Sequence, residues 1–143
     1  MTSPDISLEG ADNYQLKKGD IVFARTGASV GKTYIYKDFD GLVYYAGFLI
    51  RARIKPEYCC EFVFQNTLTE QYKKFIYITS QRSGQPGVNA QEYGNFDIFI
   101  PNYEEQKKIG AYLTSLDTLI TLHQCKLDKL KNIKKALLEK MFV

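Results

Sequence analysis

A glycine-rich segment near the N-terminus carries the residue types that hold phosphate in nucleotide-binding proteins. It reads Gly27-Ala28-Ser29-Val30-Gly31-Lys32-Thr33, whereas a phosphate-binding loop has four residues between its glycines, followed by Lys and then Ser or Thr. Only three residues separate the glycines here, and residues 33–36 predict a strand where such a loop needs a helix N-terminus. Nucleotide binding is therefore disfavoured, and the alternative is a connecting loop whose glycines satisfy turn geometry.

The histidine, cysteine and acidic residues form no recognisable catalytic or metal-binding set. The single histidine, His123, has no second histidine or C-x-x-C motif with which to bind zinc or to build a catalytic triad. The three cysteines, Cys59, Cys60 and Cys125, do not suggest a disulfide framework. The Asp and Glu residues are scattered, without the P-D…(D/E)-x-K motif of nucleases. Asn66 lies in Q-N-T-L and not in the N-P-P-[YF] motif of adenine methyltransferases. We therefore predict a non-enzymatic protein without a metal site.

The first hundred residues have the pattern of a small domain rich in short strands. Residues 57–78 carry apolar residues at spacings of three and four, which predicts one helix or two short ones. Glycine, serine and polar residues predict loops at 25–32 and 79–87. Strands are predicted for residues 20–24, 33–36, one or two segments within 42–54, and 96–100.

The last forty residues predict a single long helix with a heptad seam. No glycine or proline follows Gly110, and at 1.5 Å per residue the helix would be about 60 Å long. A domain of this size cannot cover such a helix, so it must bind a partner. We interpret His123 as a polar seam residue that fixes the register of pairing. The seam positions, separated alternately by four and three residues, are Ile109, Leu113, Leu116, Ile120, His123, Leu127, Leu130, Lys134, Leu137 and Met141.

These elements predict an α+β fold, with a β-rich domain in residues 1–103 and a coiled-coil helix in residues 104–143. Hydrophobic residues make up 45% of the 143 residues, enough to form a core. Neither a secretory signal nor a stretch of the ~20 apolar residues of a membrane span is present, so we predict a cytoplasmic protein without membrane contact. Residues 1–103 hold 11 basic and 11 acidic residues, and the net charge of +3 comes from the helix. Charge alone does not indicate nucleic acid.

Two stretches of the sequence resemble a known protein family. Residues 16–27 read LKKGDIVFARTG and are followed by VGK. This is similar to the GDI, RTG and GK motifs in target-recognition domains of type I restriction-modification specificity subunits. Further on, SGQPGVN at residues 83–89, IFIP at 98–101 and the heptad start at 104–120 resemble the junction between recognition domain and conserved helix. The ordered combination is specific, although each motif by itself is weak.

The resemblance implies a component that gives a restriction-modification system its DNA sequence specificity. Family members carry two target-recognition domains, each reading half of a split DNA site, and two conserved helices that form a spacer and dock methyltransferase subunits. Methyl transfer and cleavage belong to partner subunits that bind S-adenosylmethionine and ATP, so no cofactor is expected on this chain. The domain begins near the middle of a typical recognition domain, so we expect it to be N-terminally truncated.

Polar residues on the two predicted loops are the candidates for DNA contact. Arginine and glutamine can make bidentate contacts with guanine and adenine respectively, and a solvated loop side chain is the alternative for each residue. The DNA-contact candidates are Arg25, Thr26, Ser29, Lys32, Gln81, Arg82 and Gln85. The candidates for dimerisation and methyltransferase docking are Ile109, Leu113, Leu116, Ile120, His123, Leu127, Leu130 and Leu137.

The apolar seam also predicts self-association. Each fully buried leucine or isoleucine contributes roughly 1.5 to 3 kcal/mol, so an exposed stripe favours a second chain. The two conserved helices of family members run antiparallel. We therefore predict a two-fold homodimer with antiparallel helices centred near His123 and a domain at each end.

Two other functions remain open. A truncated half-subunit can act as an assembly or competitor protein through its coiled coil without reading DNA. A coiled-coil adaptor unrelated to restriction enzymes would not bind a methyltransferase. DNA binding separates the specificity component from the first of these, and methyltransferase binding separates it from the second.

Overall fold

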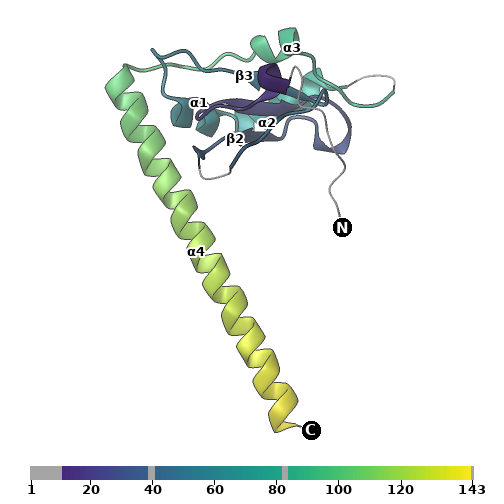
Figure 1. Cartoon of the computed structure of the whole chain (residues 1–143), viewed down its shortest axis with the longest axis vertical. Coiled ribbons are helices and arrows are strands. Elements are labelled where there is room, and N and C mark those ends of the chain that lie inside the picture. The colour runs from purple at the N-terminus through teal and green to yellow at the C-terminus, as the bar shows by residue number, and fades with distance from the viewer. Residues whose placement is uncertain (1–10, 39–40, 82–83, 143) are drawn as a thin grey trace.

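A small mixed domain and one long helix make up the computed structural model, which describes residues 11–38, 41–81 and 84–142 (Figure 1). The helix extends away from the domain to the C-terminus. This arrangement confirms the predicted α+β class. In chain order the elements are the 3-10 helix η1 (Ala11–Tyr14), β1 (Ile21–Ala24), the 3-10 helix η2 (Gly27–Ser29), β2 (Thr33–Ile35), β3 (Leu49–Ala52), α1 (Cys60–Asn66), α2 (Glu70–Thr79), α3 (Ala90–Gly94) and α4 (Tyr103–Met141).

The sheet is antiparallel, with β1 between β2 and β3. Successive residues of a strand point to opposite faces, and β1 uses both. Val22 packs with the buried Leu16 and Tyr36 on one face. Phe23 contacts a second cluster, formed by Tyr72, Ile76 and Val88, on the other. The central strand is therefore buried between two small cores, which explains its continuous apolar sequence.

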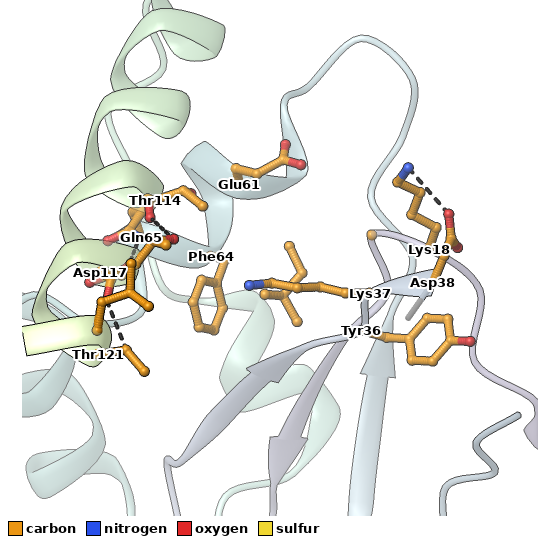
Figure 2. Close-up of a pocket in the computed structure, with 14 residues that line it drawn as sticks. Lys18, Tyr36, Lys37, Asp38, Glu61, Phe64, Gln65, Thr114, Asp117 and Thr121 are labelled. Atoms are coloured by element: carbon orange, nitrogen blue, oxygen red, sulfur yellow. Dashed lines mark hydrogen bonds and ion pairs between the residues drawn. The ribbon is translucent and has the colours of Figure 1, made fainter. Parts of the chain in front are cut away.

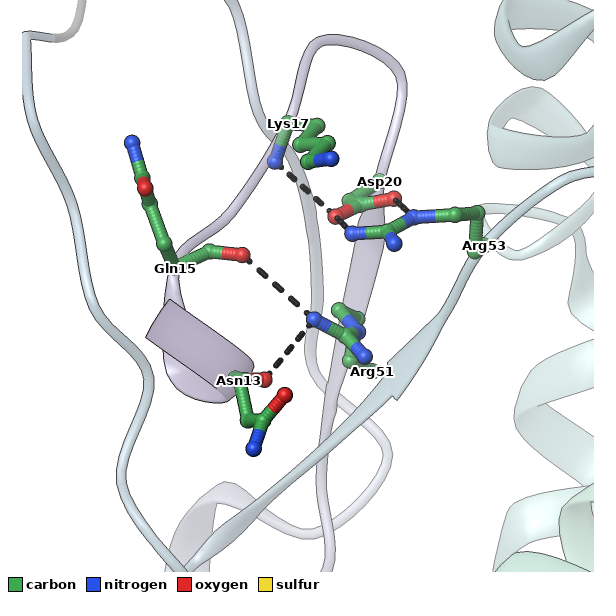
Figure 3. A network of polar contacts seen from close by, with 6 residues as sticks. All are labelled: Asn13, Gln15, Lys17, Asp20, Arg51 and Arg53. Atoms are coloured by element: carbon green, nitrogen blue, oxygen red, sulfur yellow. Dashed lines mark hydrogen bonds and ion pairs between the residues drawn. The ribbon is translucent and has the colours of Figure 1, made fainter. Parts of the chain in front are cut away.

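A buried carboxylate directly precedes β1 and is held by several hydrogen bonds (Figure 3). The side chain of Asp20, 2% exposed, accepts hydrogen bonds from Arg53 Nε at 3.0 Å, Arg53 Nη2 at 2.9 Å and the Lys17 backbone N–H at 2.9 Å. Burial raises the pKa of Asp20, but these hydrogen bonds and the Arg53 charge outweigh it, so the pKa lies below the ordinary value of 3.8. Asp20 is therefore a charged structural anchor of the loop that precedes β1.

Replacing Asp20 by asparagine is expected to lower the free energy of unfolding by about 1–3 kcal/mol at pH 7, because charge-assisted hydrogen bonds are lost. A carboxylate with a depressed pKa stabilises the fold above its unfolded pKa, and this contribution disappears as pH falls through the folded pKa. The difference between Asp20→Asn and the wild type should therefore shrink below about pH 4. Urea unfolding at pH 7 and pH 3 measures it, and a difference independent of pH would contradict this role for the charge.

Residues 57–78 were predicted to form one helix or two short ones, and they form two, α1 and α2. Thr69 caps α2 by accepting a hydrogen bond from the Tyr72 N–H, which explains the break after α1. Within 42–54 a single strand forms, β3, while Tyr44 makes an isolated bridge to Gln15. The predicted strands at 20–24 and 33–36 correspond to β1 and β2.

The strand predicted for residues 96–100 is wrong. These residues are not in a strand but connect α3 to α4. Their alternation has another cause: Phe96 packs against Tyr72 and Phe75, with ring centroids 5.2 Å apart in both pairs, whereas Phe99 is 92% exposed. One-sided packing of an extended connection gives the same period of two as a strand.

The base of α4 is fixed to α1 by close backbone packing and a buried amide. A Cβ on Gly110 would lie 2.9 Å from the Phe62 backbone nitrogen, so the two helices touch where only glycine fits. Gln106 is 2% exposed; its Oε1 accepts from the Cys59 N–H at 3.1 Å and its Nε2 donates to the Pro101 carbonyl at 2.9 Å. The predicted helix therefore starts at an anchored junction.

Beyond the Asp117–Gln65 hydrogen bond, α4 extends away from the domain. Every residue from 115 to 142 is exposed, as expected for a helix longer than the domain beside it (Figure 1). Within the described ranges, no helix is both long and apolar enough to span a membrane.

Candidate nucleic-acid interface

Three loops meet beyond the end of β1, where β2 and β3 begin. The Arg25 N–H donates to the Phe48 carbonyl at 3.1 Å, and the Arg25 carbonyl accepts from the Val88 N–H at 2.8 Å. The Gly27 N–H donates to the Pro86 carbonyl at 3.0 Å, beside a bridge between Thr26 and Gly87. We call this surface, formed by residues 25–29, 46–48 and 84–87, the loop cluster. Backbone hydrogen bonds join the three loops to one another, so the exposed side chains of the loop cluster have a rigid support.

Two tyrosine hydroxyls are hydrogen-bonded to the backbone of the loop between β1 and β2. Tyr93 Oη donates to the Ala24 carbonyl at 2.7 Å and lies 3.2 Å from the Gly31 N–H, while Tyr72 Oη donates to the Gly31 carbonyl at 2.9 Å. Burial raises the pKa of both phenols above the ordinary value. They therefore stay neutral hydrogen-bond donors at physiological pH.

The glycines of this loop have a structural purpose. Gly27 and Gly31 have φ of +74° and +81°, which favours glycine. A Cβ on Gly31 would also lie 2.5 Å from Ile76 Cγ2. Strand β2 follows the loop directly, as predicted, so no long helix presents its N-terminus to a phosphate here. The geometry supports a connecting loop.

Of the described DNA-contact candidates, four belong to the loop cluster and two lie outside it. Arg25, Thr26 and Gln85 are exposed in the loop cluster, and a Cβ on Gly27 would come within 3.0 Å of Gln85 Nε2, so this amide lies over the loop. Ser29 of the loop cluster is also exposed, as are Lys32 and Gln81 outside it, and Lys32 lines a hollow of about 730 Å³ against α2. Arg82 lies outside the described residues.

The residues that hold the loop were not among the candidates from sequence. Tyr93 belongs to α3, a short helix that was not predicted. The sequence carried a signal for this helix, because Asn89 and Glu92 have the three-residue spacing of a capping box. In the structure each of the two side chains accepts a hydrogen bond from the backbone N–H of the other residue.

The vicinal cysteines are structural. The thiols of Cys59 and Cys60 each donate to Glu61 Oε2 at 3.2 Å. Burial, followed by the Glu61 contact, raises the pKa of Cys60 to about 11, and burial also raises that of Cys59. The raised pKa values keep both thiols protonated at neutral pH, which disfavours the nucleophilic thiolate form. Within the described ranges, no three His, Cys, Asp or Glu residues gather as a possible metal site.

At the opposite end of the sheet, a groove of about 700 Å³ separates the domain from α4 (Figure 2). It is lined by Ile35 of β2, Phe64 of α1 and Thr118 of α4. Two further lining residues are hydrogen-bonded to each other, Gln65 Nε2 donating to Asp117 Oδ2 at 2.7 Å. Residues two apart are about 200° apart around a helix. Thr118 therefore lies opposite Leu116 and Ile120, and the predicted seam faces away from the groove.

The seam residues divide into a covered and a free part. Ile109 and Leu113 are half-buried near the domain. The remaining predicted pairing residues are exposed: Leu116, Ile120, His123, Leu127, Leu130 and Leu137. The free apolar face therefore starts at Leu116, beside Asp117, which still contacts Gln65 of α1.

The sequence that builds this arrangement matches one known family. The family model described as the type I restriction modification DNA specificity domain matches residues 5–132. The chain belongs to this family. The match confirms the resemblance inferred from the sequence motifs, and it covers both the loop cluster and most of α4.

Curated relatives of this specificity domain have similar sequences over nearly the whole chain. The putative type I restriction enzyme MjaX specificity subunit of Methanocaldococcus jannaschii is 28% identical over 145 residues, which cover 96% of this chain and 33% of the relative. The type I restriction enzyme HindI specificity subunit of Haemophilus influenzae is 30% identical, covering 95% of this chain and 30% of the relative. The chain thus spans about a third of the length of the relatives it matches.

Proposed function

We propose that this specificity domain is the DNA-reading component of a type I restriction-modification system and recognises half of a split target. The observation that carries the proposal is the loop cluster, whose three loops are joined by backbone hydrogen bonds and expose Arg25, Thr26 and Gln85 to solvent. Recognition through base edges needs side chains held in a fixed geometry. In this proposal Lys32 and Ser29, on the same loop, contact the phosphates that flank the bases that are read.

The second part of the proposal assigns the exposed face of α4 to protein partners. The loop cluster and the α4 junction lie at opposite ends of the sheet, so DNA and protein partners can bind together. We propose that two copies pair through antiparallel α4 helices, and that the paired helices dock methyltransferase subunits. The pair would then set the distance between the two half-sites.

Catalysis in this scheme belongs to the partners. Methyl transfer and cleavage, with S-adenosylmethionine and ATP, take place on other subunits, and this chain works without a cofactor in the cytoplasm. A symmetric homodimer would read two copies of one half-site, so its target would be a split palindrome.

A second function is favoured by one observation, the free apolar face of α4. An assembly or competitor protein needs this face and no DNA contact. The near balance of charge in residues 1–103 is compatible with it, because phosphate attraction supplies most non-specific DNA affinity.

Selection from a random-sequence duplex library tests the specificity function. The complete chain is used alone and together with the methyltransferase subunit of its own system. We expect enrichment of a short consensus, repeated in inverted orientation at a fixed spacing. A stable methyltransferase complex that enriches no sequence would instead support the assembly function, and failure to bind either DNA or methyltransferase would indicate an unrelated coiled-coil adaptor.

A further inference from the structure

A phenylalanine projects from the loop cluster into solvent. Phe48 is 75% exposed and follows Ala46 and Gly47 in a tight turn, closed by the Leu49 N–H donating to the Ala46 carbonyl at 2.9 Å. A Cβ built on Gly47 would meet no atom within 4 Å. The turn therefore has open space on its outer side and a large apolar side chain at its end.

The turn is anchored to the sheet beside an arginine. The Phe48 carbonyl accepts from the Arg25 N–H at 3.1 Å, and the next residue, Leu49, opens β3 and pairs with Ala24 of β1. Leu49 itself packs against the first core. Phe48 and Arg25 are thus neighbouring exposed side chains on one rigid support.

We infer that Phe48 is a specificity-determining residue whose ring enters a DNA groove next to Arg25 and packs on the apolar surface of a base. The inference rests on the proposed function and adds a residue type to it. Apolar contact with the thymine methyl group and insertion between base steps are the two ways in which phenylalanine reads or bends DNA. Both require a ring on a fixed, narrow projection, and the small residues Ala46 and Gly47 provide it.

The position of Phe48 favours a base over a protein partner. The predicted protein-binding face is on α4, attached at the opposite end of the sheet. Phe99, which is even more exposed at 92%, lies in the connection to α4 and outside the loop cluster. Phe99 therefore provides a matched control, since it has the same side chain and similar exposure at a different place.

The test compares Phe48→Ala, Phe48→Leu and Phe99→Ala in the full chain, using the consensus duplex selected by the wild type. Phe48→Ala should bind the consensus about tenfold more weakly, with unchanged affinity for a scrambled duplex, because an apolar base contact adds nothing to phosphate attraction. Phe48→Leu should bind with intermediate affinity, and Phe99→Ala like the wild type. An unchanged melting temperature of all three variants establishes that the fold is intact.

Replacing each thymine of the consensus by uracil distinguishes the two kinds of base contact. Loss of wild-type affinity at one uracil, to which Phe48→Ala is insensitive, identifies a methyl contact. Tolerance of every uracil, with reduced DNA bending by Phe48→Ala, identifies insertion. Equal affinity and base preference of Phe48→Ala and wild type would overturn the inference while leaving the proposed function intact. Weakened methyltransferase binding with intact DNA binding would overturn it too. A wild type that selects no DNA would overturn both.

Discussion

Replacing Leu116 or Leu127 by glutamate is expected to convert a dimer of this chain into a monomer. Both leucines are exposed on the free part of α4 and lie on the predicted seam. A buried leucine contributes roughly 1.5 to 3 kcal/mol, and two-fold symmetry applies the change twice, so the dissociation constant should rise by more than about 100-fold. Sedimentation equilibrium of the full chain at micromolar concentration measures this change.

The matched control is Asn132→Glu, which adds the same charge to an exposed position of α4 outside the seam. It should leave the dimer intact. A wild-type chain that is monomeric at these concentrations would refute the homodimer, and equal weakening by Asn132→Glu would mean that charge rather than the seam controls association.

The antiparallel direction can be tested through a charge pair. Asp117 and Lys131 stand at equal distances on either side of residue 124, next to His123. In an antiparallel pair centred there, each aspartate would face the partner's lysine. Asp117→Lys and Lys131→Asp should each weaken the dimer, and the double exchange should restore it. Because Asp117 also accepts from Gln65 Nε2 within its own chain, the restoration is the informative result.

Replacing Arg25 by alanine is expected to weaken binding to the selected DNA by about 5- to 150-fold and to relax base preference at one position, as for loss of a bidentate base contact worth about 1–3 kcal/mol. The fold should be unaffected, since Arg25 contributes its backbone to the loop cluster and its side chain is exposed. Fluorescence anisotropy with single-base variants of the consensus measures both effects.

Two lysines provide the comparison for Arg25. Lys32→Ala should weaken binding to all sequences alike and lower the dependence on salt by about one phosphate contact. Lys55→Ala, an exposed position at the opposite end of the sheet, should change neither. A uniform loss of affinity in Arg25→Ala, without relaxed preference, would reassign Arg25 to the DNA backbone.

Local sequence pattern was sufficient for elements whose signal repeats within a few residues. The heptad spacing predicted α4 to within a residue or two of its observed ends, because an amphipathic stripe over many turns has no other regular structure to explain it. The runs around Val22 and Tyr34 predicted β1 and β2 for a similar reason, being bounded by turn residues and rich in β-branched and aromatic side chains. The motifs that carry the family resemblance are of the same local kind.

Tertiary structure decided everything that depends on a neighbour distant in sequence. Residues 96–100 alternate like a strand but do not pair as one, because Phe96 is instead held by Tyr72 and Phe75. The meeting of loops 25–29, 46–48 and 84–87 depends on hydrogen bonds between backbones far apart in the chain.

The junction of α4 shows the same division between sequence and structure. The seam was visible in the sequence, but which turns the domain covers was not. Gly110 does not interrupt the heptad pattern of α4. The need for glycine there follows only from the close approach of the Phe62 backbone. Gln106 is a polar residue, and it is buried because its side-chain amide is hydrogen-bonded to Cys59 and Pro101. Periodicity describes one helix at a time, whereas close packing and buried hydrogen bonds are properties of pairs of segments, so only the folded chain determines them.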